Sequence, residues 1–486
     1  VKGDTETIDD SNQVDLTFAV IPGKKTYTRK ILFTGNHVTQ DEVLRREMRQ
    51  FEGAWSSNNS IEAGKVRLER LGYFKEVNVE TLPVVGTEDQ IDIVYNVEEE
   101  TTGSVGGNLG YSDFGLMLGF NLQEQNFLGS GNTVGIGINK NIYSESYNIS
   151  FVDPYATEDG VSLGYNIYFR ETDYGEFNVA NYLTNSNGLG AQFGYPISDI
   201  TRLGFSLTYD KTDIDIGTLP AREIYDFVAA EGNLFETLSA QASWQRVTLN
   251  RGLFPTSGSS TVLSLSATIP GSDLNYYRAN IRQRYYRPLS NNFVFGFQGE
   301  LGYLNAYGDT EETPFFQNFY AGGPRSLRGF ESNTLGPRST DAPCYEFNYE
   351  EETCPNLIDT DGDGVLDSPY INPYANTTSR YRDRPIGGNI KIEGSLQLIF
   401  KLPIIEDQRS IRSAFFLDFG NVFSDNCRDY QINCYKPSVD DLRYSYGVGV
   451  TWITGFGPLS LAIAKPSNAG PQERTEEFQF TVGNVF

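Results

Sequence analysis

Residues 442–452 read Leu-Arg-Tyr-Ser-Tyr-Gly-Val-Gly-Val-Thr-Trp, an alternation that decides the fold class. Large apolar side chains hold the even positions, and small or polar ones hold the odd positions. A strand with this pattern has one apolar and one polar face. Segments 203–209 and 390–402 alternate in the same way. An apolar outside with a polar inside is typical of a membrane β-barrel, because a soluble barrel of this size needs an apolar interior.

The composition agrees with a barrel of this kind. The 486 residues include 49 Gly, 30 Tyr and 32 Phe, yet the mean hydropathy is −0.39, as expected when apolar and polar residues alternate. No run approaches the ~18 apolar residues of a membrane helix. The net charge of −25 argues against a nucleic-acid partner, because no basic stripe is present to meet phosphates.

Residues 101–486 contain sixteen alternating segments separated by turn residues. Short turns alternate with long connections such as 211–234, 307–386 and 424–440, the asymmetry expected of periplasmic turns and outer loops. The fold class is therefore an all-β, 16-stranded antiparallel transmembrane β-barrel preceded by a small α+β domain. The predicted strands lie near 103–111, 116–124, 132–140, 145–152, 161–170, 187–196, 201–210, 235–247, 259–269, 274–287, 292–306, 387–402, 411–423, 441–454, 458–465 and 476–486.

Residues 23–100 predict the small domain, in the order strand, helix, helix, strand, strand. Thr39 is the expected cap of a first helix that runs through Arg49. The second helix is expected over 60–71, and the strands over 27–33, 76–82 and 90–97. An exposed sheet edge would accept an extended peptide, and a rigid spacer is the alternative. Residues 1–22 hold one alternating strand, at 12–20, and are a fragment of another domain.

Residues 322–330 read Gly-Gly-Pro-Arg-Ser-Leu-Arg-Gly-Phe and lie near the start of the long loop 307–386. The motif places Arg328 in a glycine-flanked turn among barrel strands. An ordered arginine in this position requires a carboxylate partner, because an unpaired buried charge is too costly to keep.

Four cysteines lie in two predicted outer loops, Cys344 and Cys354 in one and Cys427 and Cys434 in the other. Four cysteines allow three connectivities, of which pairing within each loop is the simplest. Disulfides imply an oxidising compartment. Free thiols or a metal site are less favoured, because the only histidine of the chain, His37, lies in the small domain.

Residues 359–367, Asp-Thr-Asp-Gly-Asp-Gly-Val-Leu-Asp, match the first part of an EF-hand-type calcium loop. Tyr370 replaces the bidentate glutamate at position 12, so a complete helix–loop–helix site is not expected. A structural Ca²⁺ would order the loop, and the alternative is a solvated acidic turn. The candidate ligands are Asp359, Asp361, Asp363, the Val365 carbonyl and Asp367.

Together these features resemble the BamA family, in which POTRA domains precede an outer-membrane barrel. The stretch Leu327-Arg328-Gly329-Phe330 is similar to the family's (V/I/L)RGF signature, and the chain ends on an aromatic residue like a barrel sorting signal. The resemblance makes 23–100 the last POTRA domain and 1–22 the C-terminal remnant of a preceding one. The barrel would then be 101–486.

The resemblance implies a protein-folding function with no enzyme chemistry and no required cofactor. The barrel would lie in the bacterial outer membrane, with the POTRA domain in the periplasm. The implied partners are unfolded outer-membrane protein clients, assembly-machinery lipoproteins bound through POTRA domains, and outer-membrane lipid and lipopolysaccharide. The alternative is a secretion pore of the same superfamily, either a two-partner translocator or an autotransporter assembly factor. The POTRA domain and the arginine loop argue against a passive porin.

The resemblance also suggests partners for Arg328. Asp418 matches the family's aspartate on the thirteenth strand and has the inward parity. Gln397 stands where the family has a glutamate, and Glu393, four residues earlier on the same face, is the expected substitute. Arg328, Gly329 and Phe330 would then anchor the loop inside the barrel through a charge-assisted pair. The alternative places Asp418 in an ordinary luminal network.

The resemblance further implies that the first and last strands close the barrel weakly and open sideways. Interior glycines weaken a strand, and an unpaired edge is a template for another chain; the alternative is that the glycines only curve the wall. The predicted residues of this lateral seam are Gly103, Gly106, Gly107, Asn108, Gly110, Phe480, Val482, Gly483 and Phe486.

Overall fold

The computed structural model describes residues 2–7, 14–19, 25–112, 115–157, 159–175, 179–180, 182–216, 221–340, 384–402, 410–428, 431, 434–454 and 457–483. The chain divides into two compact units, one formed by 1–103 with 124–132 and the other by 104–123 with 133–486. Among the described helices, none combines the length and apolar character needed to cross a membrane.

The N-terminal segment forms a hairpin in which β1 (Lys2–Thr7) pairs antiparallel with β2 (Val14–Ala19). The second of these strands lies within the predicted segment 12–20, whereas the first was not predicted. The assignment of 1–22 to a preceding POTRA domain stays a prediction.

The small α+β domain has the predicted order of elements: β3 (Tyr27–Thr34), α1 (Asp41–Arg45), α2 (Asn58–Arg70), β4 (Phe74–Pro83) and β5 (Gln90–Glu99). The central strand β5 runs parallel to β3 and antiparallel to β4. Both helices pack on this sheet through one apolar face, as amphipathic helices do. The core includes Ile31, Val43, Leu44, Met48, Ile61, Leu68, Val77, Ile93, Tyr95 and Val97.

The first helix differs from its prediction, because Thr39 does not cap it. The N-cap is Gln40, whose side chain makes no capping hydrogen bond, and the helix ends at Arg45 instead of Arg49. The backbone N–H of Thr39 donates to the Glu99 carboxylate at 2.6 Å, and the Thr39 hydroxyl accepts from Asn126 at 2.9 Å. Thr39 therefore holds the segment before the helix in place by tertiary hydrogen bonds.

Glu99 organises that segment. Its carboxylate also accepts the backbone N–H groups of His37 and Val38, each at 3.0 Å. Burial alone would raise the pKa of Glu99, but the hydrogen bonds from Thr39, Val38 and His37 outweigh it and hold the pKa below its usual value.

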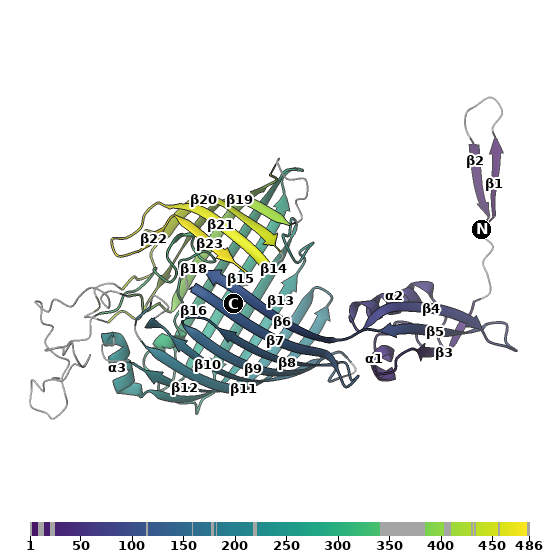
Figure 1. The fold of residues 1–486 in the computed structure, drawn as a ribbon, viewed down its shortest axis with the longest axis horizontal. Helices are drawn as coiled ribbons and strands as arrows, with labels where there is room; N and C mark the ends of the chain where they lie inside the picture. Colours follow the sequence, from purple (N-terminus) through teal and green to yellow (C-terminus); the bar gives the residue numbers. More distant parts are fainter. Residues whose placement is uncertain are drawn as a thin grey trace, which may run out of the picture. The chain divides into compact units, whose positions relative to one another are not determined.

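In the second unit, the described residues include sixteen strands that form a closed barrel, ordered as in the sequence (Figure 1). The predicted 16-stranded antiparallel fold is confirmed, with most boundaries within a few residues of their predicted positions. The strands are β6 (Gly103–Ser112), β7 (Gly115–Phe127), β8 (Asn132–Lys140), β9 (Ser144–Asp153), β10 (Ser162–Asp173), β11 (Leu183–Ser198), β12 (Thr201–Asp215), β13 (Leu234–Val247), β14 (Gly258–Thr268), β15 (Tyr276–Pro288), β16 (Phe293–Ala306), β18 (Ile390–Phe400), β19 (Ile411–Phe423), β20 (Arg443–Thr454), β21 (Gly457–Pro466) and β23 (Phe478–Val482).

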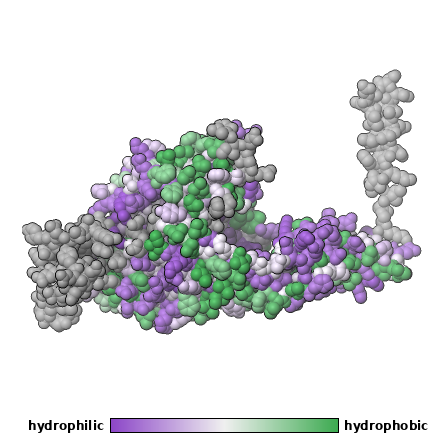
Figure 2. Space-filling model, in the orientation of Figure 1, coloured by the Kyte–Doolittle hydropathy of each residue, from purple (hydrophilic) through white to green (hydrophobic). Residues whose placement is uncertain are grey.

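Apolar side chains cover the outside of this barrel, as the alternation predicts. Figure 2 shows apolar residues gathered on the barrel wall. On β19, Phe415 and Leu417 are exposed whereas Phe416 and Asp418 are buried. Successive side chains point to opposite faces, so Phe416 and Asp418 belong to the inner face. Outward apolar residues include Phe169, Leu189, Phe205, Leu207, Phe415, Tyr446 and Phe478.

The long loops carry structure that the sequence did not predict. Helix α3 (Arg222–Glu231) lies at the end of the barrel with the long loops (Figure 1), and η2 (Phe315–Gln317) packs with it in a buried apolar cluster. Arg428 bridges the two loops by pairing with Asp226 of α3, at 2.7 Å, and with Glu312. The described parts of these loops therefore pack against one another.

Glu99→Gln tests the role of that carboxylate in the small domain. Removing the charge weakens its hydrogen bonds to three backbone N–H groups, at an expected cost of about 1–2 kcal/mol. Because the pKa is lowered on folding, this stabilisation is present above the ordinary value of 4.5 and is lost as the pH falls through the folded pKa. Hydrogen exchange of amides 37–39 should be roughly tenfold faster in the variant at pH 7.

The matched control for this experiment is Glu98→Gln. Glu98 pairs with Lys75 at 2.8 Å between two exposed side chains, an ion pair of little expected value. Equal protection of amides 37–39 in the two variants would contradict the assigned role of Glu99.

Candidate functional site

Arg328 lies against Asp418 on the inner face of the barrel. Arg328 Nε donates to Asp418 Oδ2 and Nη2 to Asp418 Oδ1, both at 2.7 Å, and the Arg328 backbone N–H donates to the same carboxylate at 3.2 Å. The Asp418 side chain is 0% exposed and that of Arg328 is 17% exposed. This two-point geometry is the strongest form of a guanidinium–carboxylate contact.

Two neighbours complete the setting of the guanidinium. Nη2 also donates to Ser395 Oγ of β18 at 3.1 Å, and the guanidinium carbon lies 3.4 Å from the ring centroid of Phe416 on β19. A cation above an aromatic face is attracted by the ring quadrupole, the more so when desolvated. The charge of Arg328 is thus balanced by Asp418, and its position is fixed by two adjacent strands.

The two residues after Arg328 are closely surrounded. Gly329 has a φ of +88°, and a Cβ there would lie 3.1 Å from the Cβ of Ala464, so a larger residue would be strained and crowded. Phe330 is completely buried, in an apolar cluster that includes Leu327, Leu335 and Val422. The motif thus combines the ion pair of Arg328, the close backbone approach at Gly329 and the buried apolar side chain of Phe330.

Glu393 also contacts the loop, although not through the residue proposed for it. It accepts from the Ser326 hydroxyl and pairs with Lys391 at 3.0 Å. Gln397 donates to Ser395 Oγ at 3.2 Å and so lies beside the site of Arg328. Glu393 was expected to pair with Arg328 in place of the family's glutamate. This expectation is wrong, because Glu393 contacts the motif through Ser326.

Several other members of this site were not predicted from the sequence. Ser326 and Ser395 are ordinary hydroxyls in the sequence, and Gln479 on the last strand contacts the motif from a position 150 residues later than Gly329. Such long-range contacts depend on the closed order of the strands. The inward parity of Gln479 was available from alternation, but its partner was not.

The described part of the seam between β23 and β6 contains few strand contacts. Among the described residues, one register pair joins the two strands, Val482 with Tyr111, whereas β21 and β23 share five and β20 and β21 share ten. The rings of Tyr111 and Phe480 stack at 5.6 Å. A Cβ on Gly483 would lie 2.2 Å from the Leu109 carbonyl oxygen, so the chains approach closely there.

The predicted seam residues take different positions around this contact. Gly110 lies next to Gly483, whereas a Cβ on Gly107 would meet nothing within 4 Å. Asn108 lies over Gly119 of β7, on the side of the first strand away from the seam. Gly106 and Gly103 face β7 and Glu124 respectively, and Phe486 lies outside the described residues. The register pairs Val482 with Tyr111, three residues after Asn108.

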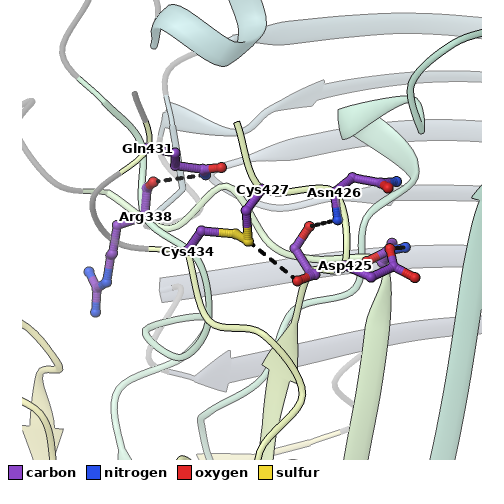
Figure 3. Close-up of a disulfide and its surroundings, with 8 residues drawn as sticks. Arg338, Asp425, Asn426, Cys427, Gln431 and Cys434 are labelled. Carbon is purple, nitrogen blue, oxygen red and sulfur yellow. Dashed lines mark hydrogen bonds between the residues drawn. A yellow bond between two sulfur atoms is a disulfide. The ribbon is translucent and has the colours of Figure 1, made fainter. Parts of the chain in front are cut away.

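One of the two expected disulfides is present. Cys427 and Cys434 are joined, and Gln431 between them donates to the Arg338 carbonyl (Figure 3). Cys344, Cys354 and the candidate calcium ligands 359–367 lie outside the described residues, so their pairing and calcium binding stay predictions. Within the described part of the chain, no group of three His, Cys, Asp or Glu side chains is arranged to hold a metal ion.

Arg328→Met tests the luminal ion pair. The variant leaves the buried Asp418 carboxylate without its cation, at an expected cost of about 3–5 kcal/mol. The midpoint of thermal unfolding in detergent should fall clearly. The control is Arg282→Met, since Arg282 pairs with Glu300 at 3.1 Å but is 67% exposed and should contribute less than about 1 kcal/mol. Equal midpoints in the two variants would show that the buried pair does not stabilise the barrel.

Comparison with known proteins agrees with this geometry. Residues 126–486 match the model of the Omp85 superfamily domain, and residues 26–100 match the POTRA model, described as surface antigen variable number repeat. The outer membrane protein assembly factor BamA of Neisseria meningitidis is 30% identical over 504 residues, which cover 98% of this chain and 59% of that protein. The chain thus spans about three fifths of the length of this relative.

Solved structures show the same architecture. The crystal structure of BamA from Haemophilus ducreyi lacking POTRA domains 1-3 has a TM-score of 0.81 and 31% identity, covering 100% of this chain and 89% of that one. CdiB from Escherichia coli, with a TM-score of 0.57 and 12% identity over 94% of this chain and 76% of its own, shares the fold. The predicted resemblance to the BamA family and the outer-membrane location with a periplasmic POTRA domain are confirmed. The chain belongs to the Omp85 superfamily.

Proposed function

We propose that this protein folds β-barrel proteins and inserts them into the outer membrane through the seam between β6 and β23. The observation that carries the proposal is the single register pair at this seam among the described residues. Its similarity to assembly factors called BamA supports the reaction class. The proposal requires no cofactor and no enzyme chemistry, because strand exchange and membrane insertion form no covalent bond.

The seam is suited to opening because, within the described part of the two strands, one register pair must be broken there. Backbone N–H and C=O groups exposed to lipid cost several kcal/mol each, so a freely opened edge is unfavourable unless another strand satisfies it. A client strand would supply those hydrogen bonds. The edge of β6 would then act as a template for the client, by strand addition.

The POTRA domain offers a second edge for partners. The outer edge of β3 is partly covered, because the Thr28 N–H donates to Ala54 O at 3.0 Å and the Ile31 N–H to the Glu52 carboxylate at 2.8 Å. In the three-stranded sheet of the described residues, β4 is the other edge. We propose that β4 is where assembly-machinery lipoproteins or extended client segments add a strand.

A secretion pore is the second candidate function. The fold likeness to CdiB supports the shared architecture, and at 12% identity it carries no argument about substrates. The two candidates differ in how many proteins depend on them. An insertase serves many barrels, whereas a secretion pore serves one class of exported substrate.

A reversible crosslink across the seam tests the gate. The double variant Tyr111→Cys with Val482→Cys uses the observed register pair. Oxidation should stop the assembly of client barrels into membranes, and reduction should restore it. The control is Leu207→Cys with Ala240→Cys, partners on β12 and β13, where oxidation should leave assembly unchanged. Full assembly by the oxidised seam variant would rule out lateral opening.

Depletion in the host tests the reaction class. Loss of an insertase should lower the levels of many outer-membrane barrels, porins included, as measured by quantitative proteomics of the outer membrane. Normal porin levels with one stranded class of secreted protein would favour the secretion pore instead.

A further inference from the structure

Gln479 on the last strand binds the backbone of the arginine motif through both ends of its amide. The Gly329 N–H donates to Gln479 Oε1 at 3.1 Å, and Gln479 Nε2 donates to the Phe330 carbonyl at 2.7 Å. The Gln479 side chain is buried, with the residue 2% exposed. Gln479 Nε2 also donates to the Glu476 carboxylate at 3.3 Å. Its two contacts with the motif are both to the main chain, so they depend on the backbone path of residues 329–330 and not on their side chains.

A short strand pairing continues this contact. The motif strand β17 (Gly329–Phe330) pairs antiparallel with β22 (Thr475–Glu476), just before the last strand. The Glu331 N–H donates to Arg474 O at 3.0 Å, and Arg474 pairs with the Glu331 carboxylate at 3.2 Å. Residues 474–476 and Gln479 are thus attached to the motif.

The attachments of β23 are unequal on its different sides. Five register pairs join it to β21, and the motif holds it from within through Gln479, whereas one described pair joins it to β6. The motif is itself fixed to β19 through Arg328 and Asp418. A continuous chain of polar contacts therefore runs from β19 through the loop to the last strand.

We propose that Gln479 is a positioning residue that couples the luminal loop to the last strand and holds β23 in the barrel wall independently of its pairing with β6. The inference rests on the proposed lateral gate for its purpose. Such a gate requires that the edge of β6 opens while β23 keeps its place in the barrel wall. The contact of Gln479 with the loop would hold β23 in that place.

The chemistry of the site favours an amide. Gly329 presents a donor and Phe330 an acceptor, and a side chain that satisfies both must accept at one atom and donate at the other. Methionine has a similar length but satisfies neither strongly. Ionised glutamate accepts but cannot donate to the Phe330 carbonyl. Leaving these buried backbone groups without partners weakens the local structure.

Hydrogen exchange of the full chain in lipid nanodiscs measures the coupling. Gln479→Met should lower the protection of amides 478–482 and 327–330 at least tenfold, with strands such as β12 unchanged. The matched control is Thr481→Val, two residues further along the same inner face and also buried. Thr481→Val should leave the protection of 327–330 as in the parent protein. Unchanged protection of both segments in Gln479→Met would overturn the proposal.

Spin-label distances separate a positioning role from general destabilisation. Labels at Phe478 on β23 and at Leu207 on β12 report the last strand, and labels at Leu461 on β21 and Leu207 report its neighbour; all three side chains are exposed on the outer face. In Gln479→Met the first distance distribution should broaden and the second should not. Broadening of both, or of neither, would contradict a role specific to β23.

These results are independent of the test of the gate. If the seam crosslink blocks assembly but Gln479→Met leaves β23 unchanged, the proposed function stands and the positioning role fails. If Gln479→Met loosens β23 while the oxidised seam variant still assembles clients, the coupling stands as a contact and the proposed function fails.

Discussion

The pairing of Arg328 with Asp418 is the interaction on which the rest of the site depends. A buried carboxylate is tolerated only with a cation and further hydrogen bonds beside it, and Asp418 obtains both from one residue of a distant loop. The contact therefore fixes the path of the chain from the outer loops into the barrel. Gly329, Phe330 and Gln479 take their positions from that path.

The barrel wall and the loop solve different physical problems. The wall satisfies its backbone by strand pairing and presents apolar side chains to lipid, as any membrane barrel must. At the seam, one register pair joins β23 to β6 among the described residues. In our proposal, the loop holds the last strand from inside through Gln479, independently of the pairing of β23 with β6. The proposed gate and the contact of Gln479 with the loop would then act together: the seam opens while β23 stays in the barrel wall.

Much of the barrel fold could be predicted from the alternation of apolar and polar residues. The apolar and polar positions of β19 and β20 have a period of two, so the inward orientation of Asp418 followed from parity alone. The number of strands followed from turn residues between alternating segments. The pairing of Cys427 with Cys434 agrees with the simplest connectivity, since seven residues separate them.

Other features depend on contacts that no local pattern encodes. Glu393 was predicted to pair with Arg328 because it lies on the inner face of its strand. Its position along the strand instead brings it to Ser326. The seam register, with its close approach of Gly483 to Leu109, could not be predicted, because periodicity specifies only the face. Thr39 was predicted as a cap from its residue type, and tertiary bonds to Glu99 and Asn126 took precedence. Helix α3 was not predicted from the sequence, because it lies inside a segment that was expected to be a long loop.

A double-mutant cycle on Arg328 and Asp418 tests the central claim most directly. The free energies of unfolding of Arg328→Met, Asp418→Asn and the double variant would be compared with that of the parent protein. A direct buried pair predicts a coupling energy of about 2 kcal/mol or more, with the double variant more stable than the sum of single losses implies. Additive losses, within about 0.5 kcal/mol, would show that the pair does not hold the loop.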